Sequence, residues 1–472
     1  MTTIFQTDPG SNAGPHAGPH AGPDAEPHAP RRADFPADFV WGCATSSYQI
    51  EGAADADGRV ESIWDRFAAT PGKIRDGSSG AVACDHYHRW PEDLDIARGL
   101  GLNANRFSIA WPRIFAGLGA KPNTKGLDFY ERLVDGMLAR GLQPWATLYH
   151  WDLPQFLQDR GGWNERATVY AFLELADAMT RRLGDRVKHW ITHNEPWCTA
   201  MIGHHEGWHA PGIADFKTAL QVAHHVLLSH GKAVPLIRAN VPDARVGIAL
   251  SLHPLRPAST GEADRAAMER HDGLRYRWFL DPLHGRGYPA ATLARVGAAA
   301  PTILPGDLDA IAAPTDFMGV NYYFPETVAD APGHGPLDAR VLAPESGEIT
   351  AMGWPVAPQG LAELLLRIEK DYRPGPLYVT ENGACFDDVV DADGAVPDVQ
   401  RRRYLMRHLA ALRQAVADGA PVKGYFAWSL VDNFEWAEGY LRRFGLVHID
   451  YATQQRRLKD SALWYRGFLH GA

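Results

Sequence analysis

The sequence is poor in cysteine and lacks the short motifs that hold a nucleotide. Its four cysteines lie far apart and show no CxxC spacing, so neither a zinc site nor a disulfide scaffold is indicated. No P-loop is present, and no GxGxxG follows the first apolar segment. We therefore expect no metal and no cofactor, and unpaired cysteines favour a reducing compartment, the cytoplasm.

Long apolar runs and concentrated positive charge are also missing. No stretch of about 18 apolar residues occurs, and no cationic segment followed by an apolar one stands near the start. We expect a soluble, unexported protein with no membrane partner. The net charge is −9, from 47 basic and 56 acidic residues, and basic residues cluster only in short runs such as 401–403. Nucleic acid is therefore not an expected partner, because neutralising phosphates requires a concentrated basic surface.

Residues 1–32 form a tract rich in Gly, Pro, His and Ala, with near-repeats at 13–16, 17–20 and 21–24. Such a tract cannot bury enough apolar surface to offset the entropy lost on ordering. Its histidines could bind a metal weakly, but plain disorder is the simpler interpretation. We expect a disordered tail over residues 1–32 and one folded domain over residues 33–472.

From residue 39 onward, short apolar segments alternate with longer amphipathic ones, which is the pattern of a parallel sheet with helical crossovers. Eight strands are predicted, at 39–44, 104–109, 143–149, 187–192, 245–252, 316–322, 377–380 and 424–430. Amphipathic helices are predicted at 168–183, 219–236 and 404–417. This order predicts a single (β/α)₈ TIM barrel of the α/β class with elongated βα loops, among them 298–306 and 331–347. A doubly wound open sheet is the alternative.

Two of the predicted strands lead into a glutamate that a strand-breaking residue follows. Glu381 stands before Asn382-Gly383, and Glu195 stands before Pro196. Either glutamate alone would more often be a solvated turn residue. Barrel enzymes, however, keep catalytic groups at the carboxyl ends of their strands. Two carboxylates at two strand ends are the minimum set for cleaving a glycosidic bond.

Aromatic, amide and imidazole side chains follow the other predicted strands. Each has a structural interpretation by itself, such as Trp428 filling core or His150 being a buried, hydrogen-bonded histidine, but their collection at one end of one barrel favours a ligand site. A pyranose has apolar faces and a ring of hydroxyls, so its site needs aromatic platforms and hydrogen-bonding groups. The set consists of Trp151, Trp354, Trp428, Trp436, Gln49, His150, Asn194 and Glu435. A small-molecule glycoside is the expected ligand.

The segments 192–196 and 379–383 resemble the two catalytic signatures of glycoside hydrolase family 1, the retaining β-glucosidases. The similarity runs from about Phe35 to Leu469, which leaves only the tail outside it. The resemblance implies a retaining β-glucosidase that hydrolyses terminal non-reducing β-D-glucosyl residues, in the context of cellulose and polysaccharide degradation. It also implies a TIM barrel and no cofactor.

The resemblance assigns roles to individual positions. Glu381 would be the nucleophile and Glu195 the acid and base, with carboxyl groups about 5–5.5 Å apart. Arg106 and Tyr323 would hold Glu381 ionised, and Asn321 would steer the acid. The remaining assignments are Asn194 to the sugar 2-hydroxyl, Gln49, His150, Glu435 and Trp436 to the outer hydroxyls of the glycone, Trp428 to its platform, Trp354 to the aglycone side, and Trp151 and Phe444 to the substrate site.

Several alternatives remain at this stage. Glu435 would repel a phosphate, which favours an unphosphorylated sugar. A β-galactosidase or β-fucosidase, or a transglycosylating β-glycosidase, would share the same site. A non-catalytic sugar-binding barrel is the alternative of a different class, but it would have no need for both carboxylates together with Arg106 and Tyr323. The sequence leaves open whether the chain forms a homo-oligomer.

Overall fold

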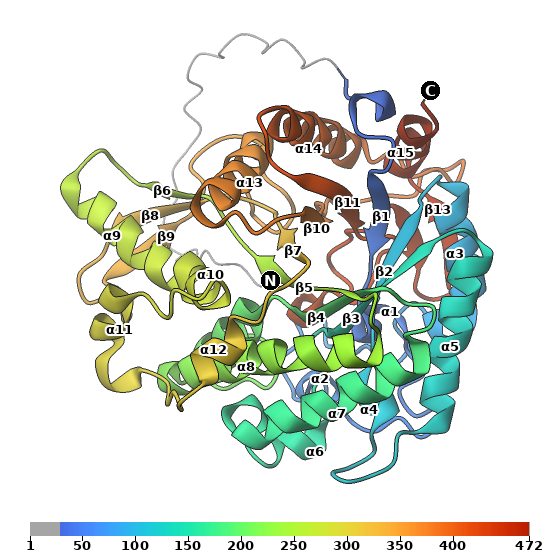
Figure 1. Cartoon of the computed structure of the whole chain (residues 1–472). Coiled ribbons are helices and arrows are strands. Elements are labelled where there is room, and N and C mark those ends of the chain that lie inside the picture. The colour runs from blue at the N-terminus through green and yellow to red at the C-terminus, as the bar shows by residue number, and fades with distance from the viewer. Residues whose placement is uncertain (1–28, 472) are drawn as a thin grey trace, which may run out of the picture.

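Eight parallel strands close into a barrel in the computed structural model, which describes residues 29–471 (Figure 1). The order around the barrel is β1-β11-β10-β7-β5-β4-β3-β2. The barrel strands are β1 (Val40–Ala44), β2 (Ala104–Ser108), β3 (Gln143–Tyr149), β4 (His189–Asn194), β5 (Arg245–Ser251), β7 (Phe317–Asn321), β10 (Leu377–Asn382) and β11 (Val422–Trp428). Because β1 pairs with both β2 and β11, the predicted TIM barrel is confirmed and the open sheet is excluded.

The predicted strands are all present, and their ends differ by a few residues at most. The informative difference lies at the carboxyl ends, where pairing continues farther than the apolar pattern indicated. Asn194 still pairs with Ala249 in β5, and Asn382 pairs with Ala427 in β11. Asn194, Glu381 and Asn382 therefore belong to the barrel wall, which positions side chains more rigidly than a loop does, and Glu195 follows directly after it.

The helices surround the barrel (Figure 1). The longer ones are α3 (His86–Gly99), α5 (Thr124–Ala139), α7 (Arg166–Leu183), α8 (Phe216–Asn240), α9 (Glu262–Asp272), α13 (Pro358–Tyr372), α14 (Val399–Ala417) and α15 (Asp460–His470). The short α-helices are α1 (Ser47–Ile50), α2 (Ile63–Ala68), α4 (Trp111–Ile114), α6 (Gln155–Gln158), α10 (Trp278–Leu283), α11 (Ala290–Val296) and α12 (Asp307–Ile311). The apolar face that the amphipathic pattern of α7 predicts is buried. No helix within residues 29–471 has the length and apolar character needed to span a membrane.

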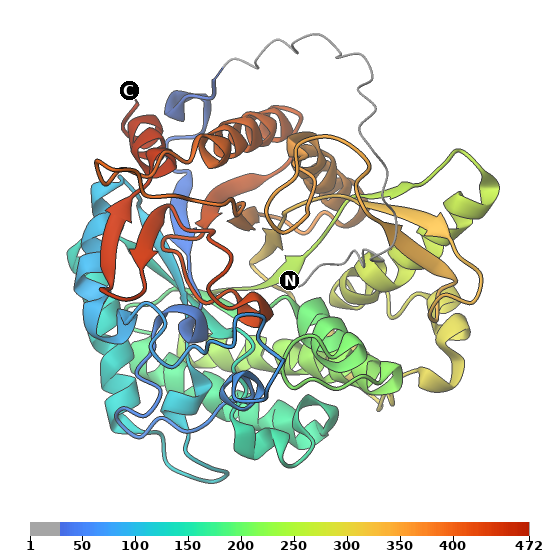
Figure 2. The ribbon, with the colours of Figure 1, turned by 180° about the vertical axis from the view of Figure 1, so that it is seen from behind.

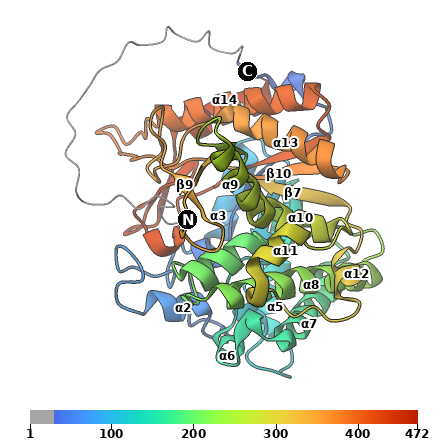
Figure 3. The same ribbon diagram turned by 90° about the vertical axis from the view of Figure 1, so that its left-hand side faces the viewer.

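Two small sheets and several turns of other helix types decorate the barrel. A three-stranded sheet of β6 (Leu255–Pro257), β8 (Glu326–Asp330) and β9 (Ala339–Leu342) stands beside α9, α10 and α11, outside the barrel wall (Figure 3). A two-stranded sheet of β12 (Val447–Asp450) and β13 (Gln455–Leu458) is seen in red in the rear view (Figure 2). The 3₁₀ turns are η1 (Arg32–Asp34), η2 (Gly162–Asn164), η5 (Gly297–Ala299) and η6 (Trp436–Glu438), and the π-helices are η3 (Cys198–Glu206) and η4 (Gly273–Arg277).

A disordered tail was predicted over residues 1–32. Residues 1–28 of this tail lie outside the described residues. The segment predicted as a loop at 331–347 contains β9, so that expectation was wrong in part. The four cysteines are buried and unpaired.

Large aromatic side chains fill the interior of the barrel beneath its carboxyl end. Trp145 of β3 is fully buried, and its ring centroid lies 5.2 Å from both Phe317 of β7 and Phe426 of β11 and 4.7 Å from Tyr378 of β10. These side chains fill the barrel interior, so it is a packed core and not a pore. Truncating a buried Trp in such a core costs about 3–5 kcal/mol. The open end, where the βα loops converge, is left for a site.

Candidate active site

The end of β10 is locked in place by the two residues that follow Glu381. The amide of Asn382 donates to the Tyr322 carbonyl at 2.8 Å and to the Tyr404 hydroxyl at 2.9 Å. Gly383 passes so close to β11 that a Cβ there would lie 1.8 Å from the Trp428 carbonyl oxygen. Only glycine fits this approach. The Asn-Gly pair therefore anchors the strand end that carries Glu381.

Both carboxylate oxygens of Glu381 accept hydrogen bonds from buried donors. Nη1 of Arg106 lies 2.7 Å from Oε1, and the hydroxyl of Tyr323 lies 2.7 Å from Oε2. Burial raises the pKa of Glu381 above its usual range and the neighbouring Glu195 adds to this, whereas Arg106 and Tyr323 oppose it. Arg106 and Tyr323 thus lie beside Glu381, although they only partly offset the effect of burial on its pKa. The predicted carboxyl separation stays a prediction.

Glu195 lies just beyond β4 with a different pair of partners. Its Oε1 accepts from Nδ2 of Asn321 at 2.9 Å, as predicted, and its Oε2 faces the thiol of Cys198 at 3.0 Å. The Thr380 hydroxyl donates to Oδ1 of Asn321 at 2.6 Å, which fixes the amide orientation. Neither donor to Glu195 is charged, in contrast to Arg106 at Glu381. The two carboxylates therefore occupy electrostatically unequal places.

Asn194 connects the two carboxylates. Its Oδ1 accepts from Nη2 of Arg106 at 2.6 Å and from Nδ2 of Asn321 at 3.0 Å. Its Nδ2 lies 3.0 Å from Nε2 of His150, and its backbone carbonyl accepts from the Trp151 indole at 2.9 Å. Burial lowers the pKa of His150 well below its usual value, so this imidazole is neutral. A neutral ring can accept from Asn194 and donate elsewhere.

Ten of the fourteen predicted site residues line one narrow pocket. They are His150, Trp151, Glu195, Tyr323, Trp354, Glu381, Trp428, Glu435, Trp436 and Phe444. Six of these side chains belong to Trp, Tyr or Phe, and the rings of Trp151 and Trp436, for example, lie 4.6 Å apart. Of the other four, His150 stacks on Trp428, and Glu381 accepts a hydrogen bond from Tyr323. Aromatic faces beside carboxyl and imidazole groups are the chemistry that a sugar ring requires. Arg106, Asn194, Asn321 and Gln49 connect to this lining through hydrogen bonds.

Three residues of the lining have left-handed backbone conformations that side chains rarely adopt. The φ angles are 76° at Trp151, 49° at Glu195 and 50° at Trp436. Each such conformation costs on the order of 1 kcal/mol, and such residues cluster at functional sites. All three side chains line the pocket.

Gln49 and Glu435 lie on the side of the pocket formed by the loops after β1 and β11. Nε2 of Gln49 donates to Oδ1 of Asn433 at 2.9 Å and lies 3.4 Å from Oε2 of Glu435. The Ser46 hydroxyl donates to Oε1 of Gln49 at 2.7 Å, so the amide is held at both ends. Burial raises the pKa of Glu435 to about 7, against the hydrogen bond from Gln49. An amide and a carboxyl side by side offer a donor and an acceptor to neighbouring sugar hydroxyls.

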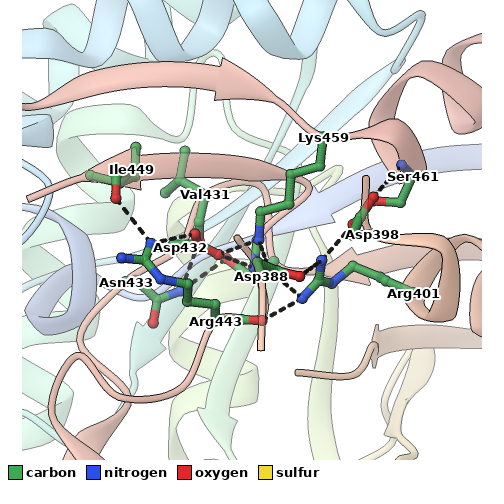
Figure 4. Close-up of polar contacts among 12 residues, drawn as sticks. Asp388, Asp398, Arg401, Val431, Asp432, Asn433, Arg443, Ile449, Lys459 and Ser461 are labelled. Atoms are coloured by element: carbon green, nitrogen blue, oxygen red, sulfur yellow. Dashed lines mark hydrogen bonds and ion pairs between the residues drawn. The ribbon is translucent and has the colours of Figure 1, made fainter. Parts of the chain in front are cut away.

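Six charged residues, here called the rim cluster, lie together beside the loop after β11, which carries Glu435, Trp436 and Phe444 (Figure 4). The side chains of five are buried, and that of Arg443 is partly exposed. Its members are Asp388, Asp398, Arg401, Asp432, Arg443 and Lys459. Nζ of Lys459 lies 2.5 Å from Oδ2 of Asp388 and 2.6 Å from Oδ1 of Asp432. Asp432 also accepts from Arg443 at 2.8 Å and from the Gly445 backbone at 2.9 Å. Three acids balance three bases, so the cluster is formally neutral and joins the loop after β11 to α14 and α15.

The segment His205-Glu206-Gly207-Trp208-His209 matches the HExxH pattern of zinc enzymes, which places two histidines on one face of a helix. Here η3 ends at Glu206 and Gly207 turns the chain with φ 69°. His205 packs on Phe216, whereas the His209 ring lies 5.2 Å from that of Trp64. Within residues 29–471, no group of three His, Cys, Asp or Glu side chains could hold a metal ion.

Sequence reasoning missed Thr380, Cys198 and Asn433, each of which contacts a predicted site residue. All three lie within three residues of a predicted one, so proximity in the chain was the only available signal. The rim cluster gave no signal, because its members are scattered over residues 388–459.

Comparisons with known proteins agree with this geometry. The profile of "Glycosyl hydrolase family 1" matches residues 31–471. "Beta-glucosidase A" of Acetivibrio thermocellus is 47% identical over 437 residues, covering 91% of this chain and 97% of that protein. A "Bifunctional beta-D-glucosidase/beta-D-fucosidase" of Bifidobacterium breve is 44% identical over 456 residues, covering 92% and 98%. The solved family 1 β-glucosidase of Thermotoga maritima superposes with a TM-score of 0.90 at 44% identity, covering 93% and 98%, and it has also been solved with glucoimidazole.

Proposed function

The chain belongs to glycosyl hydrolase family 1 and is a retaining β-glucosidase, and we propose that Glu381 is its nucleophile and Glu195 its acid and base. The observation that carries this assignment is the inequality of their partners. Glu381 receives a charged donor and a hydroxyl, which favour its anion. Glu195 receives only an amide and a thiol.

The first step transfers the glucosyl unit to the enzyme. Glu381 attacks the anomeric carbon, the bond from that carbon to the aglycone oxygen breaks, and Glu195 gives its proton to the departing oxygen. Arg106 and Tyr323 orient the attacking carboxylate. Forming the ester neutralises Glu381, which removes the negative charge that favoured a protonated Glu195.

The second step returns the enzyme to its starting state. Glu195, now a carboxylate, removes a proton from water, the water oxygen attacks the anomeric carbon, and the bond to Glu381 breaks. The configuration at that carbon inverts twice and is retained. When a sugar hydroxyl attacks the intermediate in place of water, the glucosyl unit is transferred to that sugar. Transglycosylation therefore needs no additional residue.

The glycone is bound by the aromatic lining and by the amide and carboxyl side chains around it. We assign Asn194 to the 2-hydroxyl, Gln49, His150, Trp151, Glu435 and Trp436 to the remaining hydroxyls and faces, Trp428 to the platform, and Trp354 and Phe444 to the side where the aglycone leaves. A glucoside without a phosphate is the preferred substrate, because Glu435 would repel an anion. The relative from Bifidobacterium breve supports the acceptance of β-fucosides as well.

Removal of each carboxylate tests the assignment with an aryl β-glucoside. We expect Glu381→Ala to lose more than about 10⁴-fold in kcat, and azide to restore turnover with a glucosyl azide of inverted configuration. For Glu195→Ala, azide should give the retained product, because Glu381 still forms the intermediate. The configuration is read by NMR of the isolated azide.

Glu363→Ala serves as the matched control, since it removes an exposed glutamate that pairs with Arg256. It should keep the wild-type rate and release glucose only. Retained azide product from Glu381→Ala would contradict the proposed roles. The absence of nitrophenol release by the wild-type protein between pH 5 and 8 would contradict the β-glucosidase activity itself.

A further inference from the structure

Cys198 lies against the acid and base although nothing in the composition pointed to it. It is the first residue of η3, three positions after Glu195, and its side chain is buried. Its Sγ lies 3.0 Å from Oε2 of Glu195, and its backbone N–H donates to the Glu195 carbonyl at 2.9 Å. The two residues thus contact through both backbone and side chain, so the thiol has a fixed direction relative to the carboxyl.

The side chain of Cys198 is a neutral thiol in the working range of pH. Burial raises the pKa of this thiol well above its ordinary value, and the negative charge of Glu195 adds to the shift. A thiolate is therefore absent, and the S–H can donate to the carboxylate. Thiols are weak donors and weak acceptors, so this bond is easily broken and re-formed.

The two oxygens of Glu195 consequently differ in their ability to take a proton. Oε1 is held by an amide N–H of Asn321, which can only donate because Thr380 fixes the opposite end of that amide. Oε2 has the thiol of Cys198 as its only hydrogen-bond partner within residues 29–471. When Oε2 binds a proton, the S–H can rotate away at little cost. An amide N–H at Oε1 has no such freedom.

We propose that Cys198 is a positioning residue that keeps Oε2 of Glu195 as the oxygen that gives and takes the mobile proton. This inference rests on the acid and base role proposed for Glu195. A weak donor at Oε2 is suited to both halves of the reaction: it stabilises the carboxylate enough for base catalysis and does not hold it so firmly that the acid form is lost.

Other ionisable groups face Glu195 from the surrounding elements. Glu381 comes from β10, Tyr323 from the segment after β7, and Glu435 from the loop after β11. Arg106 of β2 reaches the same region through Asn194, and Arg275 of η4 lies near Cys198. These groups set the overall field at Glu195, and they remain unchanged when Cys198 is replaced. A change caused by Cys198 is therefore measurable against a constant background.

Two substitutions of Cys198 should move the alkaline limb of kcat/KM in opposite directions. Cys198→Ser places a stronger hydroxyl donor at Oε2 and favours the carboxylate, so the limb should move down by about one pH unit. Cys198→Ala removes the donor, so the limb should move up by about half a unit. Cys198→Val, which is closer in volume, should shift in the same direction as Cys198→Ala.

Substrates with different leaving groups separate the two halves of the reaction. Cys198→Ser should slow alkyl glucosides more than dinitrophenyl glucoside, because only the alkyl leaving group needs the proton. Cys198→Ala should slow the release of the glucosyl-enzyme, which limits the rate for dinitrophenyl glucoside. Loss of packing alone would lower the rates with both substrates in both variants and leave the alkaline limb of kcat/KM in place. The Cys43 thiol is also buried, and it lies in β1, which pairs with β2 and β11 and not with β4, so Cys43→Ser and Cys43→Ala are matched controls.

This inference is overturned if the Ser, Ala and Val variants of Cys198 keep the wild-type alkaline limb while thermal melting shows that they are folded. It is also overturned if the Ser and Ala variants shift in the same direction. Failure of the proposed function is a separate result, since Glu195→Ala would then not give retained azide product. With retained azide product and an unmoved limb, Glu195 stays the acid and base and only the role of Cys198 is rejected.

Discussion

The hydroxyl of Tyr323 influences how readily Glu381 loses its proton. It donates to Oε2 of Glu381 at 2.7 Å and opposes the rise in pKa that burial causes. Tyr323→Phe removes this donor, so the pKa of Glu381 rises further and a smaller fraction is ionised at a given pH. The acid limb of kcat/KM should therefore move up by about one pH unit. The measurement is a pH–rate profile with an aryl β-glucoside.

Tyr322→Phe is the matched control, because the adjacent hydroxyl donates to the Ala357 carbonyl and not to Glu381. Its acid limb should stay at the wild-type position. The alkaline limb should stay in place in both variants, since it reports the proton of Glu195. A lower kcat for Tyr323→Phe with an unmoved acid limb would show that the hydroxyl only orients the carboxylate.

Individual residues differed in how far the sequence could identify them. Glu195 and Glu381 were predictable because each ends an apolar strand in a signature of defined chemistry. Cys198 was not, because its contact with Glu195 arises from the turn just before η3, in which the Cys198 N–H donates to the Glu195 carbonyl. The ordering of protons between the two carboxyls depends on burial and on donors from distant strands. Such quantities have no counterpart in a local pattern.

Among the structural elements, the loop after β11 depends most on buried charge. Lys459 stands at the start of α15 and has no exposed surface, with Asp388 and Asp432 as its partners. Lys459→Met leaves two carboxylates facing each other, and breaking a buried pair costs about 3–5 kcal/mol. We expect the free energy of unfolding to fall by that amount, as measured by chemical denaturation.

The same substitution should affect the substrate site through Asn433, which follows Asp432 and accepts from Gln49. We expect KM for an aryl β-glucoside to rise more than kcat falls, because the chemistry at Glu195 and Glu381 is not touched. Lys188→Met is the control, since its pair with Asp243 is exposed and such pairs contribute about 0–1 kcal/mol. Equal stability of the two variants would reject a structural role for the rim cluster.

The elements were predictable to the extent that burial imposes a regular pattern. Barrel strands are buried on both faces and read as continuous apolar runs, so all eight were found. The strand β13, with the sequence Gln-Arg-Arg-Leu, carries no such pattern and was missed. The same holds for β6, which is three residues long. Short strands outside the barrel are specified by their partner and not by their own residues.

At the scale of the whole molecule, the folded domain is anchored at its beginning by one aromatic side chain. Phe35 is buried, and its ring lies 5.0 Å from Trp41 of β1 and 6.3 Å from Phe468 of α15. The family profile starts at residue 31, close to this anchor. We therefore propose that the catalytic domain begins just before Phe35.

Two truncations on either side of this anchor test the boundary. Removing residues 2–28 should leave kcat/KM within about twofold and the melting temperature within about 1 °C, because the tail composition cannot contribute a core. Removing residues 2–36 deletes Phe35 and should reduce stability by about 3–5 kcal/mol, the cost of truncating a buried Phe. Thermal melting and aryl β-glucoside kinetics measure both. If the shorter truncation already loses activity, the first 28 residues belong to the catalytic unit; if both truncations are equally stable, Phe35 does not anchor the fold.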